Sequence, residues 1–217
     1  MYRAKTNILS IILKALLFAL LAGIIIGYIF GYRYVLVNGW SSEPYIPYQS
    51  LILTAKTKLE NLKVGDFITY TSSNQIIFSR QSNVTHQIVA IKYDGYYEEG
   101  ETVTLVADDK TYTFEFGNEI SLDKDGNPTY TKMTDVPEKC NIITLQRRSG
   151  KADVSAPEEY KNFDEVVGKV VGHNVVLGKT MFLLMENPLI MFGFFGCFVL
   201  LFVMKEQFSI ENLRIYK

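Results

Sequence analysis

The sequence predicts a mainly β protein, with an antiparallel β-sheet or barrel-like extracytoplasmic domain flanked by an N-terminal and a C-terminal transmembrane helix. Apolar residues make up 48% of the 217 residues and are concentrated near the two ends of the chain. Short segments rich in Val, Ile, Thr, Tyr and Phe fill the middle, and turn residues separate them. The net charge of -1 gives no electrostatic reason to expect nucleic acid as a partner.

Residues 8–30 form the first apolar run, which is interrupted by a single charge at Lys14. The aliphatic stem of a lysine can carry its amine toward the lipid headgroups. At about 1.5 Å per residue, a helix over this run would cross a hydrocarbon core of roughly 30 Å. The alternative is a cleaved signal peptide, whose apolar core usually has about 7–15 residues. We therefore expect a retained transmembrane helix at 8–30.

A second apolar run near the C-terminus predicts another transmembrane helix over 181–204. Lys and Arg residues flank the outer ends of both runs, which places both termini in the cytoplasm and the chain between the runs outside. The predicted location is thus the cell membrane, with two spans. The expected divisions are 1–7 cytoplasmic, 8–30 transmembrane, 31–180 extracytoplasmic, 181–204 transmembrane and 205–217 cytoplasmic.

Short alternating segments in the middle of the chain predict the strands of the extracytoplasmic domain. These segments are 51–55, 66–70, 76–80, 85–91, 102–107, 111–116, 141–146 and 166–172. Residues 93–139 are rich in Tyr, Asp, Glu and Thr and carry hairpin signals, but no pattern that suggests chemistry. We expect a non-catalytic insertion there, with a surface for a partner or substrate as the alternative.

Metal and cofactor motifs are absent from the sequence. There is no glycine-rich phosphate loop, no His-Glu-x-x-His and no Cys-x-x-Cys, so we expect neither a metal nor a cofactor. Cys140 lies in the predicted outer domain and Cys197 in a predicted span, so no internal disulfide is expected.

Catalysis by a side-chain hydroxyl group is the possibility that remains. The best candidate segment for it is Asn-Gly-Trp-Ser-Ser-Glu-Pro-Tyr-Ile-Pro at 38–47. A serine nucleophile needs an exposed oxygen and a base to take its proton. Pro44 and Pro47 favour an extended chain, and Gly39 permits close approach of another backbone, so Ser41 or Ser42 would be presented on a rigid loop. The alternative is an interfacial turn anchored by the Trp and Tyr of this stretch.

His86 is the candidate base. It lies in a predicted strand, where alternation places it on one face with Ile88 and Ala90. A histidine among apolar neighbours is often structural, but imidazole is also the commonest general base.

Four ordered segments resemble the motifs of type I signal peptidases, in particular the branch of endospore-formers, archaea and the endoplasmic reticulum. Residues 39–50 resemble its nucleophile box, Gly-x-Ser-Met-Glu-Pro followed by an apolar residue, Pro and Ser. Residues 64–70 resemble its Gly-Asp strand, and residues 84–89 resemble its base box, Val-Thr-His-Arg-Val-Val. Residues 151–159 resemble its acid box, Lys-Gly-Asp-Asn-Asn and a later Asp. In addition to these four segments, residues 166–170 match its closing Val-Val-Gly-Lys-Val.

The resemblance implies roles for individual residues. Ser41, three residues before a proline, takes the position of the nucleophile, and His86 takes the position of the base. Asp153, Glu158 and Glu159 are the candidates for the acid that orients the imidazole. This box departs from the family pattern, because Ala152 replaces its glycine, both asparagines are missing and the later aspartate falls on a glutamate.

The implied activity is that of a membrane-bound serine endopeptidase that removes signal peptides from translocated preproteins. Its implied partners are the signal peptides of secreted preproteins, membrane lipid and the protein-translocation machinery. An inactive signal-peptidase-like scaffold or assembly factor is the first alternative, given the altered acid box. The second is a sortase-like cysteine transpeptidase built on His86, Cys140 and Arg147, although Cys140 precedes a predicted strand where a sortase cysteine would end one.

Overall fold

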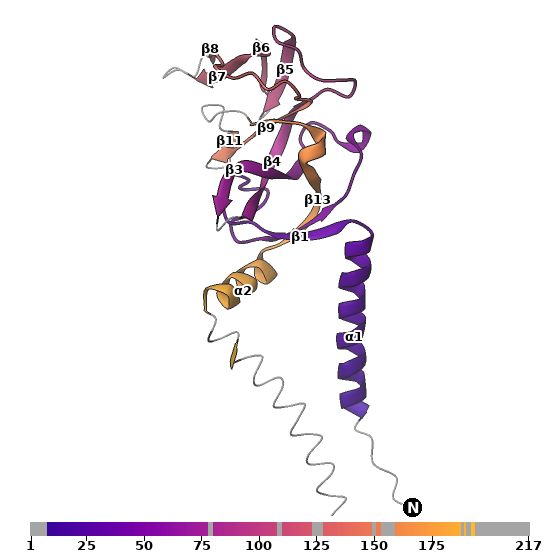
Figure 1. The fold of residues 1–217 in the computed structure, drawn as a ribbon. Helices are drawn as coiled ribbons and strands as arrows, with labels where there is room; N and C mark the ends of the chain where they lie inside the picture. Colours follow the sequence, from indigo (N-terminus) through magenta and orange to yellow (C-terminus); the bar gives the residue numbers. More distant parts are fainter. Residues whose placement is uncertain are drawn as a thin grey trace, which may run out of the picture.

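The computed structural model is mainly β, and it describes residues 8–77, 80–107, 110–122, 128–148, 151–152, 159–187, 189 and 192–193. Strands lie between two helices in the chain order (Figure 1). The elements are α1 (Ile8–Ile29), β1 (Tyr32–Leu36), β2 (Leu51–Ala55), η1 (Leu59–Asn61), β3 (Phe67–Ile77), β4 (Arg80–Ile91), β5 (Thr102–Ala107), β6 (Lys110–Glu115), β7 (Asn118–Leu122), β8 (Pro128–Lys132), β9 (Ile142–Leu145), β10 (Arg147–Arg148), β11 (Lys151–Ala152), β12 (Glu159–Lys161), η2 (Phe163–Glu165), β13 (Val166–Asn174) and α2 (Val175–Glu186).

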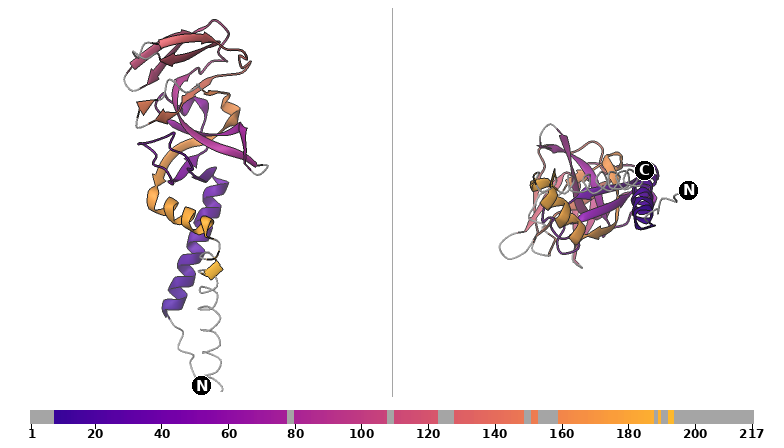
Figure 2. Two further views of the ribbon diagram at one scale, coloured as in Figure 1. Left: turned by 90° about the vertical axis from the view of Figure 1, so that its left-hand side faces the viewer. Right: turned by 90° about the horizontal axis from the view of Figure 1, so that it is seen from below.

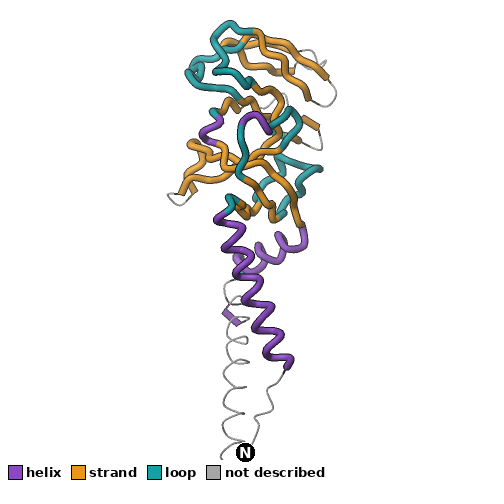
Figure 3. The backbone as a smooth tube through the Cα atoms, turned by 90° about the vertical axis from the view of Figure 1, so that its right-hand side faces the viewer, coloured by secondary structure: helices purple, strands orange, loops and turns teal. Residues whose placement is uncertain are grey.

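The main sheet of the described residues has seven strands in the order β1-β2-β13-β3-β4-β9-β12, and all of its pairings are antiparallel. The hairpins β5–β6 and β7–β8, which belong to the predicted insertion, form separate two-stranded sheets. They lie at the end of the molecule opposite α1 and α2 (Figures 1 and 3). The insertion thus adds two β-hairpins to the main sheet, at the end that is remote from the helices.

The two faces of β4 contribute to two different hydrophobic clusters, because successive side chains of a strand point to opposite faces. Ile88 packs with Leu62, Ile68, Tyr70 and Ile142, in what we call the central cluster. Val89 and Ala90 pack with the side chains of the insertion hairpins. The predicted face of His86, Ile88 and Ala90 is therefore wrong at Ala90, because the register of β4 against β9 shifts between Ile88 and Ala90.

The prediction that two transmembrane helices flank the β domain is contradicted. In the described part of the chain, no helix combines the length and apolar character needed to cross a membrane. α2 has 12 residues, so it is about 18 Å long, against a hydrocarbon core of roughly 30 Å. This finding contradicts the predicted pair of flanking spans, at 8–30 and 181–204, and with it the two-span cell-membrane location with cytoplasmic termini. Residues 188, 190–191 and 194–204 of the second predicted span lie outside the described residues.

α2 packs behind the loop that carries the candidate serines. The side-chain amide oxygen of Asn174 accepts a hydrogen bond from the Leu177 N–H and so caps the start of the helix. Figure 2 shows α2 directly beneath the strands. Phe182 of α2 is buried and lies 6.3 Å from Tyr48, centroid to centroid. At Gly178 the helix meets the backbone of residues 49–51 so closely that a Cβ atom would overlap it.

We expect Gly178→Ala to destabilise the protein by about 1–3 kcal/mol, because the added methyl group has to displace backbone rather than a flexible side chain. Gly172→Ala is the matched control, since a Cβ atom there meets nothing within 4 Å. Chemical denaturation of the two variants and the wild type measures the difference. Equal midpoints for both variants would contradict the tight contact at Gly178.

Candidate functional site: a serine and a histidine on adjoining elements

Ser41 lies in the turn region between β1 and β2 and is half-buried. Its neighbour Ser42 is buried and donates a hydrogen bond from Oγ to the Thr85 carbonyl oxygen at 2.6 Å. The backbone N–H of Arg147 donates to the Ser41 carbonyl oxygen at 2.7 Å. The loop between β1 and β2, residues 37–50, which we call the serine loop, is therefore hydrogen-bonded to both β4 and β10.

His86 lies in the interior part of β4, opposite Ile68 of β3, and is 2% exposed. Its Nε2 atom is 3.0 Å from Ser41 Oγ. The two candidates that the sequence places 45 residues apart are thus within hydrogen-bonding distance. This is the distance that a general base needs in order to take the proton of a nucleophile.

The other ring nitrogen of His86 has a partner that the sequence analysis missed. The hydroxyl oxygen of Tyr70 is 2.7 Å from His86 Nδ1, and Tyr70 is fully buried in the central cluster. The strand alternation contained the signal for this contact, because Tyr70 follows Ile68 by two residues and so shares the face that His86 occupies on the neighbouring strand.

Two of the three acid candidates, Asp153 and Glu158, lie outside the described residues. Glu159 belongs to β12, where its backbone pairs with Thr144 of β9, and its side chain is outside what the structure describes. The orienting role of an acid therefore stays a prediction. The phenol of Tyr70 is what the described residues place at Nδ1.

Arg147 connects the serine loop to the histidine strand by its side chain as well. It is buried, and its Nη1 donates to the Gln87 side-chain oxygen at 2.7 Å. Its guanidinium carbon lies 4.8 Å from the ring centroid of Tyr45, in the serine loop. Such cation–π contacts are stronger where water is excluded. Arg147 thus holds the two sides of the site together, which is a structural role.

Cys140 is unsuited to the role of a nucleophile. It is fully buried in the cluster that joins the main sheet to the insertion. Burial raises the pKa of its thiol to about 12, so the thiol stays protonated near neutral pH, whereas the thiolate is the reactive form. The described residues therefore contain no reactive thiol that could serve as the nucleophile of a sortase-like enzyme.

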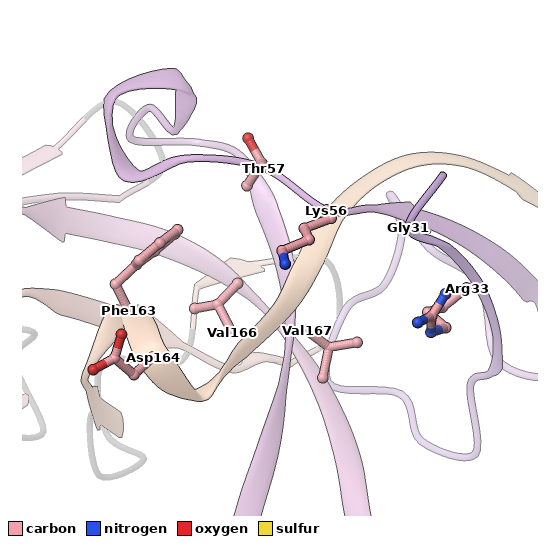
Figure 4. A pocket seen from close by; sticks show the side chains of 8 residues that line it. All are labelled: Gly31, Arg33, Lys56, Thr57, Phe163, Asp164, Val166 and Val167. Atoms are coloured by element: carbon pink, nitrogen blue, oxygen red, sulfur yellow. The ribbon is translucent and has the colours of Figure 1, made fainter. Parts of the chain in front are cut away.

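A separate cavity of about 430 Å³ lies away from these residues, between the ends of β1 and β2 and the start of β13 (Figure 4). Its lining includes two cationic side chains, Arg33 and Lys56, and an apolar wall from Phe163, Val166 and Val167. The guanidinium of Arg33 is already engaged, because it donates to two backbone carbonyl oxygens and lies over the Tyr28 ring. None of the candidate catalytic residues lines this cavity.

No group of three or more metal-ligating side chains gathers in the described part of the chain. A scan against models of known protein families finds no match, and a search of curated proteins finds no significant relative. The geometry of Ser41 and His86, together with the sequence motifs around them, is therefore what bears on function.

The burial of Cys140 predicts a protected thiol. At pH 8 a group with a pKa of about 12 is ionised in about one molecule in ten thousand, against about a quarter for an ordinary cysteine thiol. We expect alkylation of Cys140 by iodoacetamide to be at least about 1000-fold slower in the folded chain than in the denatured chain. Peptide mapping by mass spectrometry separates Cys140 from Cys197. Rapid labelling of native Cys140 would contradict its assignment to the core.

Proposed function

We propose that the chain is a serine endopeptidase that removes signal peptides from preproteins. The observation that carries the proposal is the 3.0 Å separation between Ser41 Oγ and His86 Nε2. A buried imidazole against a half-exposed hydroxyl is the arrangement that serine nucleophiles require. The altered acid box does not remove this pair, which favours an enzyme over the inactive scaffold.

The geometry supports acyl transfer in two steps. Ser41 Oγ attacks the scissile carbonyl carbon while His86 Nε2 takes its proton, and the resulting imidazolium then protonates the leaving amine. Water, deprotonated by the same nitrogen, hydrolyses the acyl ester and restores Ser41. The developing oxyanion needs hydrogen-bond donors. The Ser41 N–H is suited to this role, since it makes no hydrogen bond within the described residues.

One feature of the site and one of the sequence favour a peptide with an apolar segment as substrate. Trp40 and Tyr45 flank Ser41 in the chain and are 66% and 56% exposed. Exposed aromatic side chains next to a nucleophile offer contact area to an apolar chain. A signal peptide has an apolar core followed by a small-residue cleavage site. The resemblance of the nucleophile and base boxes to the signal peptidase motifs supports this class among peptide substrates.

Cleavage of a preprotein with a small-x-small site by the purified full-length chain tests the proposal. We expect Ser41→Ala to lower the cleavage rate at least about 1000-fold, because the nucleophile is lost, and to leave the stability near that of the wild type. Mass spectrometry of the products establishes whether the cut falls directly after the small-x-small site.

Ser42→Ala is the matched control, because Ser42 is adjacent but bonded to Thr85 instead of His86. We expect this variant to lose about 1–2 kcal/mol of stability, since it leaves a buried carbonyl oxygen unpaired, and to keep measurable cleavage. Equal cleavage by wild type and Ser41→Ala would refute the assignment of the nucleophile. A wild-type chain that cuts no preprotein would instead support the scaffold alternative.

A further inference from the structure

We propose that Tyr70 is a positioning residue for His86. Its phenol oxygen accepts a hydrogen bond from Nδ1–H, and this leaves Nε2 unprotonated, so that Nε2 can act as the base. The catalytic meaning of this contact rests on the proposed function, although the hydrogen bond itself does not. The oxygen-to-nitrogen distance is 2.7 Å. Tyr70 and His86 are 0% and 2% exposed, so water has little access to compete for this bond.

The sheet register brings the phenol to this place. His86 is directly opposite Ile68, and Tyr70 is opposite Val84, so Tyr70 and His86 are diagonal neighbours on one face of the β3–β4 pair. Diagonal neighbours are within reach of an aromatic side chain. The two rings meet nearly edge to face, with centroids 5.9 Å apart and planes at 66°.

Neighbouring strands restrain the Tyr70 ring. The ring packs with Leu62, Ile68 and Ile88 in the central cluster. Lys161 Nζ of β12 lies 4.9 Å from the ring centroid, and Thr144 Oγ1 of β9 is 3.5 Å from the phenol oxygen. A side chain held from several strands has few other rotamers, so it can determine the orientation of its hydrogen-bond partner.

The chemistry of imidazole makes the direction of this bond decisive. A neutral imidazole carries one hydrogen, on either Nδ1 or Nε2. If Tyr70 donated to Nδ1, the hydrogen would be on Nε2, which would then donate to Ser41 and could not take its proton. When Nδ1–H donates to Tyr70, Nε2 is the bare nitrogen that faces Ser41 Oγ. A tyrosine that accepts from Nδ1–H thereby holds this tautomer, which is the task that an aspartate performs in the usual triad.

A neutral phenol differs from a carboxylate in two respects, because it can donate as well as accept a hydrogen bond and because it is uncharged. It can hold the tautomer and the ring orientation, but it brings no negative charge to stabilise the imidazolium that forms during the reaction. We therefore expect removal of the phenol oxygen to affect kcat more than KM, because substrate binding does not depend on the imidazole tautomer. A loss of about 100-fold in kcat corresponds to the lower end of general-base contributions.

Nitrogen-15 NMR of the imidazole rings in the full-length chain tests the inference without any substrate. The chain contains two histidines, and the second, His173, is exposed on β13, so His173→Gln assigns the His86 signals. In the wild type, neutral His86 is expected to carry its hydrogen on Nδ1. Tyr70→Phe should shift the population toward the Nε2–H tautomer and lower kcat about 100-fold with little change in KM.

Tyr93→Phe is the matched control, because Tyr93 also loses a phenol hydrogen bond, to the Leu62 carbonyl oxygen at 2.8 Å, but does not contact His86. Its His86 tautomer should equal that of the wild type. A wild-type hydrogen on Nε2, or a tautomer unchanged in Tyr70→Phe, would overturn the inference. The wild-type spectrum alone decides the matter if Tyr70→Phe does not fold. If the His86 tautomer depends on Tyr70 but the chain cleaves no preprotein, the proposed function is refuted. The hydrogen bond between Tyr70 and His86 would still be supported by that result.

Discussion

The hydrogen-bonding distance between Ser41 Oγ and His86 Nε2 is the constraint on which the functional interpretation of the fold depends. The two residues come from different kinds of element, a turn and a strand, so three contacts have to hold them together. Ser42 bonds to the residue before His86, Arg147 bonds to Ser41 through its backbone, and the Arg147 side chain bonds to the residue after His86. Because these contacts lie on both sides of the pair, separating the serine loop from β4 would break several hydrogen bonds, one of them buried.

The arrangement of the layers separates this site from the rest of the molecule. One face of β4 contributes His86 and Ile88 to the site and the central cluster, while Val89 on the other face packs toward the insertion hairpins. The insertion can therefore be stabilised by the main sheet without any of its residues entering the site. α2 supports the serine loop from the opposite end, through Gly178 and Phe182. His86 thus lies on an inner strand of the main sheet, and Ser41 meets it from the adjoining loop.

Sequence reasoning could find Ser41 and His86 because each lies in a short local motif with a recognisable neighbour pattern. It could not find Tyr70 with the same ease, because that contact depends on the register of two strands, which no local motif specifies. It also placed Ala90 on the wrong face, since a single irregularity in register reverses the alternation. Hydropathy alone predicted the two spans, whereas the second run begins inside α2, a helix that starts at a capped Asn174 and ends at Glu186.

The most direct measurement is to trap the acyl-enzyme. The full-length chain is mixed with the p-nitrophenyl ester of a peptide that ends in a small-x-small sequence, quenched in acid and mapped by mass spectrometry. The Ser41–His86 pair predicts a peptidyl adduct on Ser41 that is absent in Ser41→Ala and forms far more slowly in His86→Gln. An adduct on another residue, or equal labelling of Ser41 in wild type and His86→Gln, would contradict a serine activated by this histidine.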